Sequence, residues 1–158
     1  MMRPLQITTT THAMTIASYT MCAVLGVLHA TGAATHQAVT EAVGAGGVGA
    51  WILLMIGGAI TALAGAMLAP RQAVPTGALT VEAVGTAALA LTLTGYAVSL
   101  TVWFGWSGGP TTQTMAYGLG IGAAARLAQI IHELRRLHSA TRHTTPVVVA
   151  GVDDHDDA

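Results

Sequence analysis

Four long apolar stretches, separated by short polar or glycine-rich segments, run along this chain. They cover residues 13–34, 50–69, 78–104 and 115–131. The second is uncharged and has the length of a membrane-spanning helix, about 20 residues. The fourth continues without Pro or Gly into a basic amphipathic segment, 132–142, which predicts a helix that leaves the membrane. We expect an all-α integral membrane protein with four transmembrane helices.

The rest of the chain predicts connections and ends around one four-helix transmembrane domain, residues 13–138. Residues 1–12 form a polar lead, and residues 143–158 form a disordered acidic tail that ends in DDHDDA. A polar, glycine-rich link is expected at 35–49, and a short turn at 70–75.

The first stretch admits a second interpretation, a cleaved secretory signal peptide. Arg3 precedes it, and Gly32 and Ala34 are small residues before a candidate cleavage site. The long Thr-rich lead and the length of the stretch argue against cleavage. As a transmembrane helix, it would place Ser18, Cys22, Gly26 and His29 on one packed face.

The amino-acid composition indicates that most of the chain is surrounded by lipid rather than by water. Only 8% of the 158 residues are charged, 53% are hydrophobic, and the mean hydropathy is +0.61. Soluble domains carry roughly 25% charged residues. All six basic residues are Arg, and the richness in Ala, Gly, Thr and Val suggests a GC-rich, actinobacterial genome. The near-zero net charge gives no indication of nucleic-acid binding.

Charge asymmetry predicts the topology. Four membrane passages place both termini and the 70–75 turn on one side, with five of the arginines: Arg3, Arg71, Arg135, Arg136 and Arg142. The opposite loops, 35–49 and 107–114, contain no Arg or Lys. The positive-inside rule therefore predicts a bacterial plasma-membrane protein with both termini cytoplasmic. Four aromatic residues then fall at the outer interface: Trp51, Trp103, Trp106 and Tyr117.

Two charges lie inside apolar stretches, Glu82 and Arg126. Glu82 lies four residues, about 6 Å, into the third stretch, and Arg126 lies a similar distance before the fourth one ends. A charge on an isolated helix in lipid costs roughly 2.5–3.5 kcal/mol, and pairing offsets much of that cost. We predict a structural intramembrane ion pair. A proton or ion pathway, or unpaired snorkelling of both side chains, are the alternatives.

Small residues at helical spacing predict a helix-packing face in the second and fourth stretches. The residues concerned are Gly57, Gly58, Ala62, Gly65, Gly118 and Gly122. Simple Ala and Gly richness in a GC-biased gene is the competing explanation.

The segment beyond Arg126 is amphipathic. Its candidate contact residues are Leu127, Ile130, Leu134, Arg135, Arg136 and Leu137. It would lie on anionic lipid, pair with a second copy, or dock a cytoplasmic protein. A simple stop-transfer anchor is the plainest alternative.

No motif predicts catalysis. The chain has no phosphate-binding loop, zinc-protease HExxH or nucleophile elbow, and its single cysteine excludes an intramolecular disulfide. We therefore expect no enzyme activity, no cofactor and no metal site.

The segment GLGIGAAARLAQIIHELRRL, together with the layout of residues 78–138, resembles small four-span membrane proteins of actinobacterial phages, some of them holin-like. The resemblance implies a homo-oligomer that permeabilises the inner membrane. The acidic end departs from the usual basic holin tail.

Two other functions stay open: a non-lytic accessory protein, for superinfection exclusion or partner anchoring through the C-terminal helix, and a small transporter. A transporter would need internal repeats and broken helices, and the two halves of the chain do not resemble each other.

Overall fold

The computed structural model describes residues 9–32, 37–71, 75–105 and 110–143. These residues form helices and short turns, with no strand among them. The elements in chain order are α1 (Thr9–Ala30), α2 (Gln37–Leu68), the 3₁₀ helix η1 (Ala69–Arg71), α3 (Thr76–Phe104) and α4 (Pro110–His143). The all-α prediction is confirmed for these residues.

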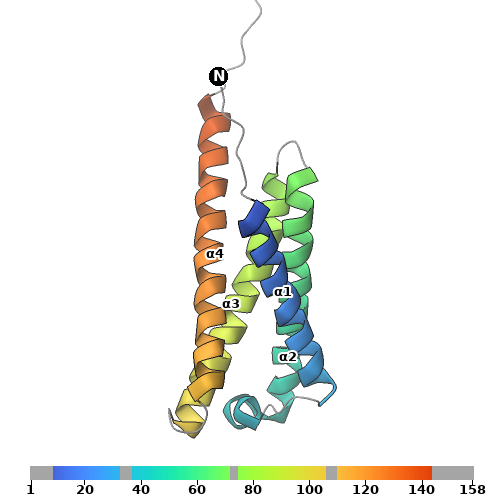
Figure 1. Ribbon diagram of the computed structural model, residues 1–158, viewed down its shortest axis with the longest axis vertical. Helices are drawn as coiled ribbons and strands as arrows, with labels where there is room; N and C mark the ends of the chain where they lie inside the picture. Colours follow the sequence, from blue (N-terminus) through green and yellow to red (C-terminus); the bar gives the residue numbers. More distant parts are fainter. Residues whose placement is uncertain (1–8, 33–36, 72–74, 106–109, 144–158) are drawn as a thin grey trace, which may run out of the picture.

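The helices pack in the order of the chain. α1 packs on α2, α2 on α3 and α3 on α4, each antiparallel to the one before (Figure 1). Among the described residues, no extensive contact joins α1 to α4. The bundle is therefore open between its first and last helices. We call the end that holds Ala69–Arg71 the η1 end; α4 continues beyond it (Figure 1).

Three helical segments are long and apolar enough to cross a membrane: Ala13–Ala30, Gly44–Arg71 and Thr76–Phe104. They correspond to the first three predicted transmembrane helices. α4 is longer, but Arg126 and Gln129 interrupt its apolar half, and it does not meet the same criterion. The structure therefore supports a multi-pass membrane protein with three candidate spans.

The polar, glycine-rich link expected at 35–49 is helical over most of the residues that the structure describes. Helix α2 already begins at Gln37 and changes direction at Gly44, whose φ is 72°. Glycine adopts this left-handed conformation without the steric cost of a Cβ atom. The glycines therefore bend the helix at one point rather than abolish it.

The remaining boundaries differ from expectation by a few residues. α1 runs from Thr9 to Ala30, so it begins and ends four residues earlier than the 13–34 stretch, and Gly32 follows it with a φ of 74°. α4 includes the whole predicted extension, 132–142. The polar lead before Thr9 and the tail after His143 lie outside the described residues.

Glycines bring α2 and α3 into close contact. A Cβ atom added to Gly65 would lie 2.7 Å from the Cα of Glu82, and one added to Gly85 would lie 2.6 Å from the carbonyl oxygen of Gly58. Neither position tolerates a larger residue unless the backbones separate. This contact fixes the spacing of α2 from α3, and with it the position of Glu82.

The turn between α3 and α4 is held by side chains of α4. Gln113, 1% exposed, donates from Nε2 to the carbonyl oxygen of Gly105 at 2.6 Å. One turn further on, the hydroxyls of Tyr117 and Thr101 lie 3.2 Å apart. Gly120 then packs against Thr94. α4 is thus aligned with α3 along several turns.

Candidate functional site

A buried polar junction joins three helices near the η1 end. Arg126 of α4 donates from Nε to Oε1 of Glu82 of α3, at 2.9 Å. The Glu82 side chain is 1% exposed, whereas that of Arg126 is 22% exposed. The sequence placed these two charges at matching depths, and in the structure they form an ion pair.

Tyr19 of α1 completes the junction. Its hydroxyl donates to Oε1 of Glu82 at 3.1 Å and lies 2.8 Å from Oγ1 of Thr86. The Thr86 hydroxyl in turn donates to the backbone carbonyl of Glu82 at 2.7 Å. Since Thr86 uses its only proton there, the single proton of Tyr19 faces two acceptors, Glu82 and Thr86. Glu82 is therefore the centre to which α1 and α4 are both attached.

The second carboxylate oxygen of Glu82, Oε2, is buried and accepts no hydrogen bond from the described part of the chain. Arg126 and Tyr19 both contact the other oxygen, so the carboxylate is bound on one side only. The guanidinium carries five N–H donors, of which Nε–H binds Glu82 and one on Nη1 reaches Oε1 of Gln129 at 3.4 Å. The other N–H donors of the guanidinium remain on the partly exposed side of Arg126.

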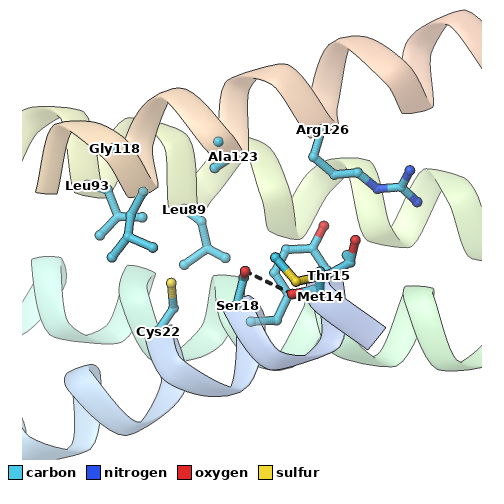
Figure 2. Close-up of a pocket in the computed structure, with 12 residues that line it drawn as sticks. Met14, Thr15, Ser18, Cys22, Leu89, Leu93, Gly118, Ala123 and Arg126 are labelled. Atoms are coloured by element: carbon cyan, nitrogen blue, oxygen red, sulfur yellow. Dashed lines mark hydrogen bonds between the residues drawn. The ribbon is translucent and has the colours of Figure 1, made fainter. Parts of the chain in front are cut away.

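A groove runs between α1 and α4, where the bundle is open. Its part next to Arg126 has a volume of about 270 Å³, with Leu89 and Leu93 of α3 as its floor. α1 contributes Ser18 and Cys22, and α4 contributes Gly118, Leu119, Gly122 and Ala123. Figure 2 shows Arg126 at one end of this groove, with its guanidinium extending along α4 away from Gly118. The groove is therefore lined mostly by apolar side chains, which we call its body, and the guanidinium of Arg126 forms its cationic end.

A second pocket, of about 390 Å³, shares Leu93 and Leu119 with the first and continues toward the opposite end of the bundle. His29, Trp51 and Tyr96 line it. Their rings lie edge to face, with centroids 5.0 Å apart for His29 and Trp51 and 6.0 Å apart for His29 and Tyr96. The imidazole thus sits in an aromatic cluster far along the helices from Glu82.

The predicted packing residues fall into two groups. Gly58, Ala62 and Gly65 are buried between α2 and α3. Gly57, Gly118 and Gly122 are exposed, and a Cβ atom added to any of them would meet nothing within 4 Å. None of these three makes a close helix contact within the described part of the chain. Gly57 lies on the outer side of α2, and Gly118 and Gly122 line the groove.

The aromatic residues predicted for the outer membrane interface lie in different environments. Trp51 is packed inward: its Nε1 donates to the carbonyl oxygen of Thr92 at 3.3 Å, and its ring contacts Tyr96. Trp103 is 52% exposed near the end of α3, and Tyr117 is half-buried against Thr101. Trp106 lies outside the described residues. Trp51 is therefore a packing residue, whereas Trp103 has the exposure that an interface residue requires.

The amphipathic pattern of the α4 extension appears in its burial. Ile130 is fully buried, whereas Arg135 and Arg136 are exposed. Three leucines of the same face are half-buried: Leu127, Leu134 and Leu137. The apolar face of this segment thus lies toward the bundle, and its basic face is open.

Sequence reasoning missed Tyr19 and Thr86. It placed Ser18 on the packed face of α1, but Ser18 is exposed and donates to the carbonyl of Met14. The buried positions are Tyr19, Cys22, Gly26 and His29. The available signal was a tyrosine within an apolar helix, because a buried Tyr hydroxyl usually finds a hydrogen-bond partner.

The described residues include no group of three or more His, Cys, Asp or Glu that could hold a metal ion. No protein-family model matches the chain, and no curated protein or solved structure matches it with significance.

Proposed function

We propose that α4 is a fourth transmembrane helix and that both termini lie on the cytoplasmic side of a bacterial plasma membrane. The ion pair supports this proposal, because Glu82 offsets the charge that lowers the hydropathy of α4. The contacts of Gln113, Tyr117 and Gly120 with α3 support it too, since they align α4 with a helix that is apolar enough to span. The arginine distribution supplies the orientation.

We further propose that the protein acts without catalysis, by lateral assembly and permeabilisation of the membrane, as holins do. The observation that carries this proposal is the open side of the bundle, where α1 and α4 leave a groove unfilled. Because this side is open in the single chain, permeabilisation would come from several copies that cover one another's open side. Helices from neighbouring copies would replace lipid along the open side as the protein accumulates.

Induced expression tests this function directly. The protein should accumulate without early harm and then abruptly collapse the membrane potential, as reported by a potential-sensitive dye. A matched control is the Gly65→Val variant, which should disrupt α2–α3 packing and prevent the collapse. Stable growth with unchanged potential at high membrane levels of wild-type protein would refute the holin-like function.

A second candidate, partner anchoring, is favoured by the length of α4. The helix continues to His143, well past the last apolar turn, and exposes Arg135 and Arg136 there. Deletion of residues 132–158 should then abolish capture of a cytoplasmic protein and leave membrane insertion unchanged. The same deletion should leave permeabilisation intact if only the part of α4 before residue 132 is required for it.

A further inference from the structure

The cationic end of the α1–α4 groove has unused hydrogen-bonding capacity. Arg126 binds Glu82 through Nε, which leaves the Nη edge on the partly exposed side of the guanidinium. Gln129 accepts a second, longer hydrogen bond, from Nη1 of Arg126 at 3.4 Å. In the topology proposed above, on which this inference rests, that edge lies near the inner headgroup layer, where the phosphates of lipids are within reach of its unused donors.

Phosphate is the acceptor that matches this edge. A guanidinium offers parallel N–H donors that bind phosphate oxygens in a bidentate manner. The Arg126 side chain extends along α4 toward the η1 end, which is the direction of the inner headgroups (Figure 2). The groove body, lined by Leu89, Leu93 and Cys22, is apolar. A phosphate at one end and an apolar groove behind it are the two parts of a phospholipid site.

The dimensions agree with one leaflet. Arg126 and Gly118, at the two ends of the first pocket along α4, are eight residues apart, about 12 Å at the helical rise of ~1.5 Å per residue. Half of a hydrocarbon core of about 30 Å is about 15 Å. An acyl chain whose headgroup lies at Arg126 would therefore end near Gly118. The second pocket extends the groove toward the other leaflet.

The local charge favours an anionic headgroup. The charged residues of the described helices at the η1 end are Arg71, Arg126, Arg135, Arg136 and Arg142 against Glu82 and Glu133, a net charge of +3. Basic residues beside the inner leaflet attract anionic lipid. Glu82, which could repel such a lipid, is buried and already paired.

We propose that the groove between α1 and α4 binds one anionic phospholipid of the inner leaflet. Its phosphate accepts hydrogen bonds from the Nη edge of Arg126, and one acyl chain lies on Leu89 and Leu93 between Cys22 and Gly122. The lipid fills the open side of the single chain, and its phosphate accepts the hydrogen bonds that Arg126 does not make within the chain. Lateral assembly through this side then requires displacement of the lipid.

Photocrosslinking in nanodiscs that hold one copy tests the site. The discs contain phosphatidylcholine with a trace of phosphatidylglycerol that carries a diazirine in its acyl chain. Crosslinks, mapped by mass spectrometry, should concentrate on residues 89–93 and 118–123. Unlabelled phosphatidylglycerol should suppress them, whereas equal phosphatidylcholine or inorganic phosphate should not. Crosslinks spread evenly to outward residues such as Ile60, or insensitive to competition, would overturn the proposal.

Two variants separate the groove from its cationic end. Gly122→Leu fills the groove at a position where an added Cβ meets nothing, and Gly57→Leu adds the same volume outside it. The first should lower groove crosslinking about tenfold, the loss expected from one good contact, and the second should leave it unchanged. Arg126→Lys keeps the charge but loses the bidentate edge. It should reduce the preference for phosphatidylglycerol over phosphatidylcholine severalfold.

The same maps distinguish failure of the site from failure of the topology. If α4 does not lie in the membrane, none of its residues will be labelled. If it spans the membrane without a lipid site, label will be distributed over all its lipid-facing residues, and Gly122→Leu will behave like Gly57→Leu.

Discussion

Gly65 of α2 lies against the backbone of Glu82 in α3, so close that a Cβ atom at position 65 would approach the Glu82 Cα to 2.7 Å. The glycine holds the charged residue at a fixed depth in the bundle without contacting its carboxylate. The α2–α3 contact and the polar junction therefore depend on each other: a change that separates the two helices at Gly65 also moves Glu82.

Replacement of Gly65 by Ala should destabilise the protein. The methyl group must push α2 and α3 apart, and overpacking of this kind costs about 1–3 kcal/mol. The measurement is reversible unfolding in mixed detergent micelles, followed by tryptophan fluorescence. Gly57→Ala is the matched control, because nothing lies within 4 Å of an added Cβ there. Equal stability of the two variants would contradict the close contact.

Removal of either partner of the ion pair should have unequal effects. Arg126→Gln leaves a buried carboxylate without its counter-ion, and loss of one partner of a buried pair costs about 3–5 kcal/mol. Glu82→Gln should cost less, because Arg126 is 22% exposed and its long side chain can reach the membrane surface. Unfolding of each variant in the same micelles measures the difference.

The double variant Glu82→Gln/Arg126→Gln supplies the control for this pair. It should be more stable than Arg126→Gln alone, with a coupling of about 0.5–3 kcal/mol between the two positions. A charge swap should likewise insert and accumulate better than either single change. Additive effects would mean that the two side chains do not interact.

Tyr19→Phe should loosen α1 specifically. The change removes the hydroxyl that binds Glu82 and lies beside Thr86, at a cost of about 1 kcal/mol for a typical hydrogen bond. Hydrogen exchange should increase in α1 and little elsewhere. Tyr117→Phe is the comparison, since that hydroxyl pairs with Thr101 between α3 and α4. Equal exchange in α1 of both variants would refute the attachment through Tyr19.

Single cysteines test the proposed topology. In a Cys22→Ser background, a cysteine at Glu41 should react in intact cells with a membrane-impermeant maleimide. A cysteine at Ser139, on α4 beyond the η1 end, should react only after the membrane is permeabilised. Both positions are exposed in the structure, so a difference reports the membrane and not burial. Labelling of Ser139→Cys in intact cells would place the C-terminal end of α4 outside.

Depth could be predicted from the sequence because the helical rise is constant. Glu82 and Arg126 are the two charges within long apolar stretches, so their distances from the ends of those stretches determined their relative height. The partner on α1 could not be predicted in this way. Tyr19 carries no charge, and the choice between it and Ser18 depends on the rotation of α1 about its own axis, which only packing on α2 determines.

The helical segment before Gly44 was missed for a different reason. Glycine weakens a helix by about 1 kcal/mol relative to alanine, so a glycine-rich stretch at 44–49 predicts a loop on local grounds alone. In the structure the chain is helical on both sides of Gly44, and the departure from helical geometry is confined to that residue. Gly58 and Gly65 pack closely while Gly57 does not, because one residue of offset rotates a position by about 100° around the helix, away from α3.

The order of the helix contacts has a consequence for synthesis. Each extensive interface joins helices that are consecutive in the chain, so each new helix finds its partner already made as it leaves the ribosome. Such local contacts favour rapid folding. The junction at Glu82 is the exception, since Tyr19 and Arg126 are more than one hundred residues apart in the sequence. It forms last, when α4 arrives, and a chain that lacks α4 leaves a buried glutamate without its arginine.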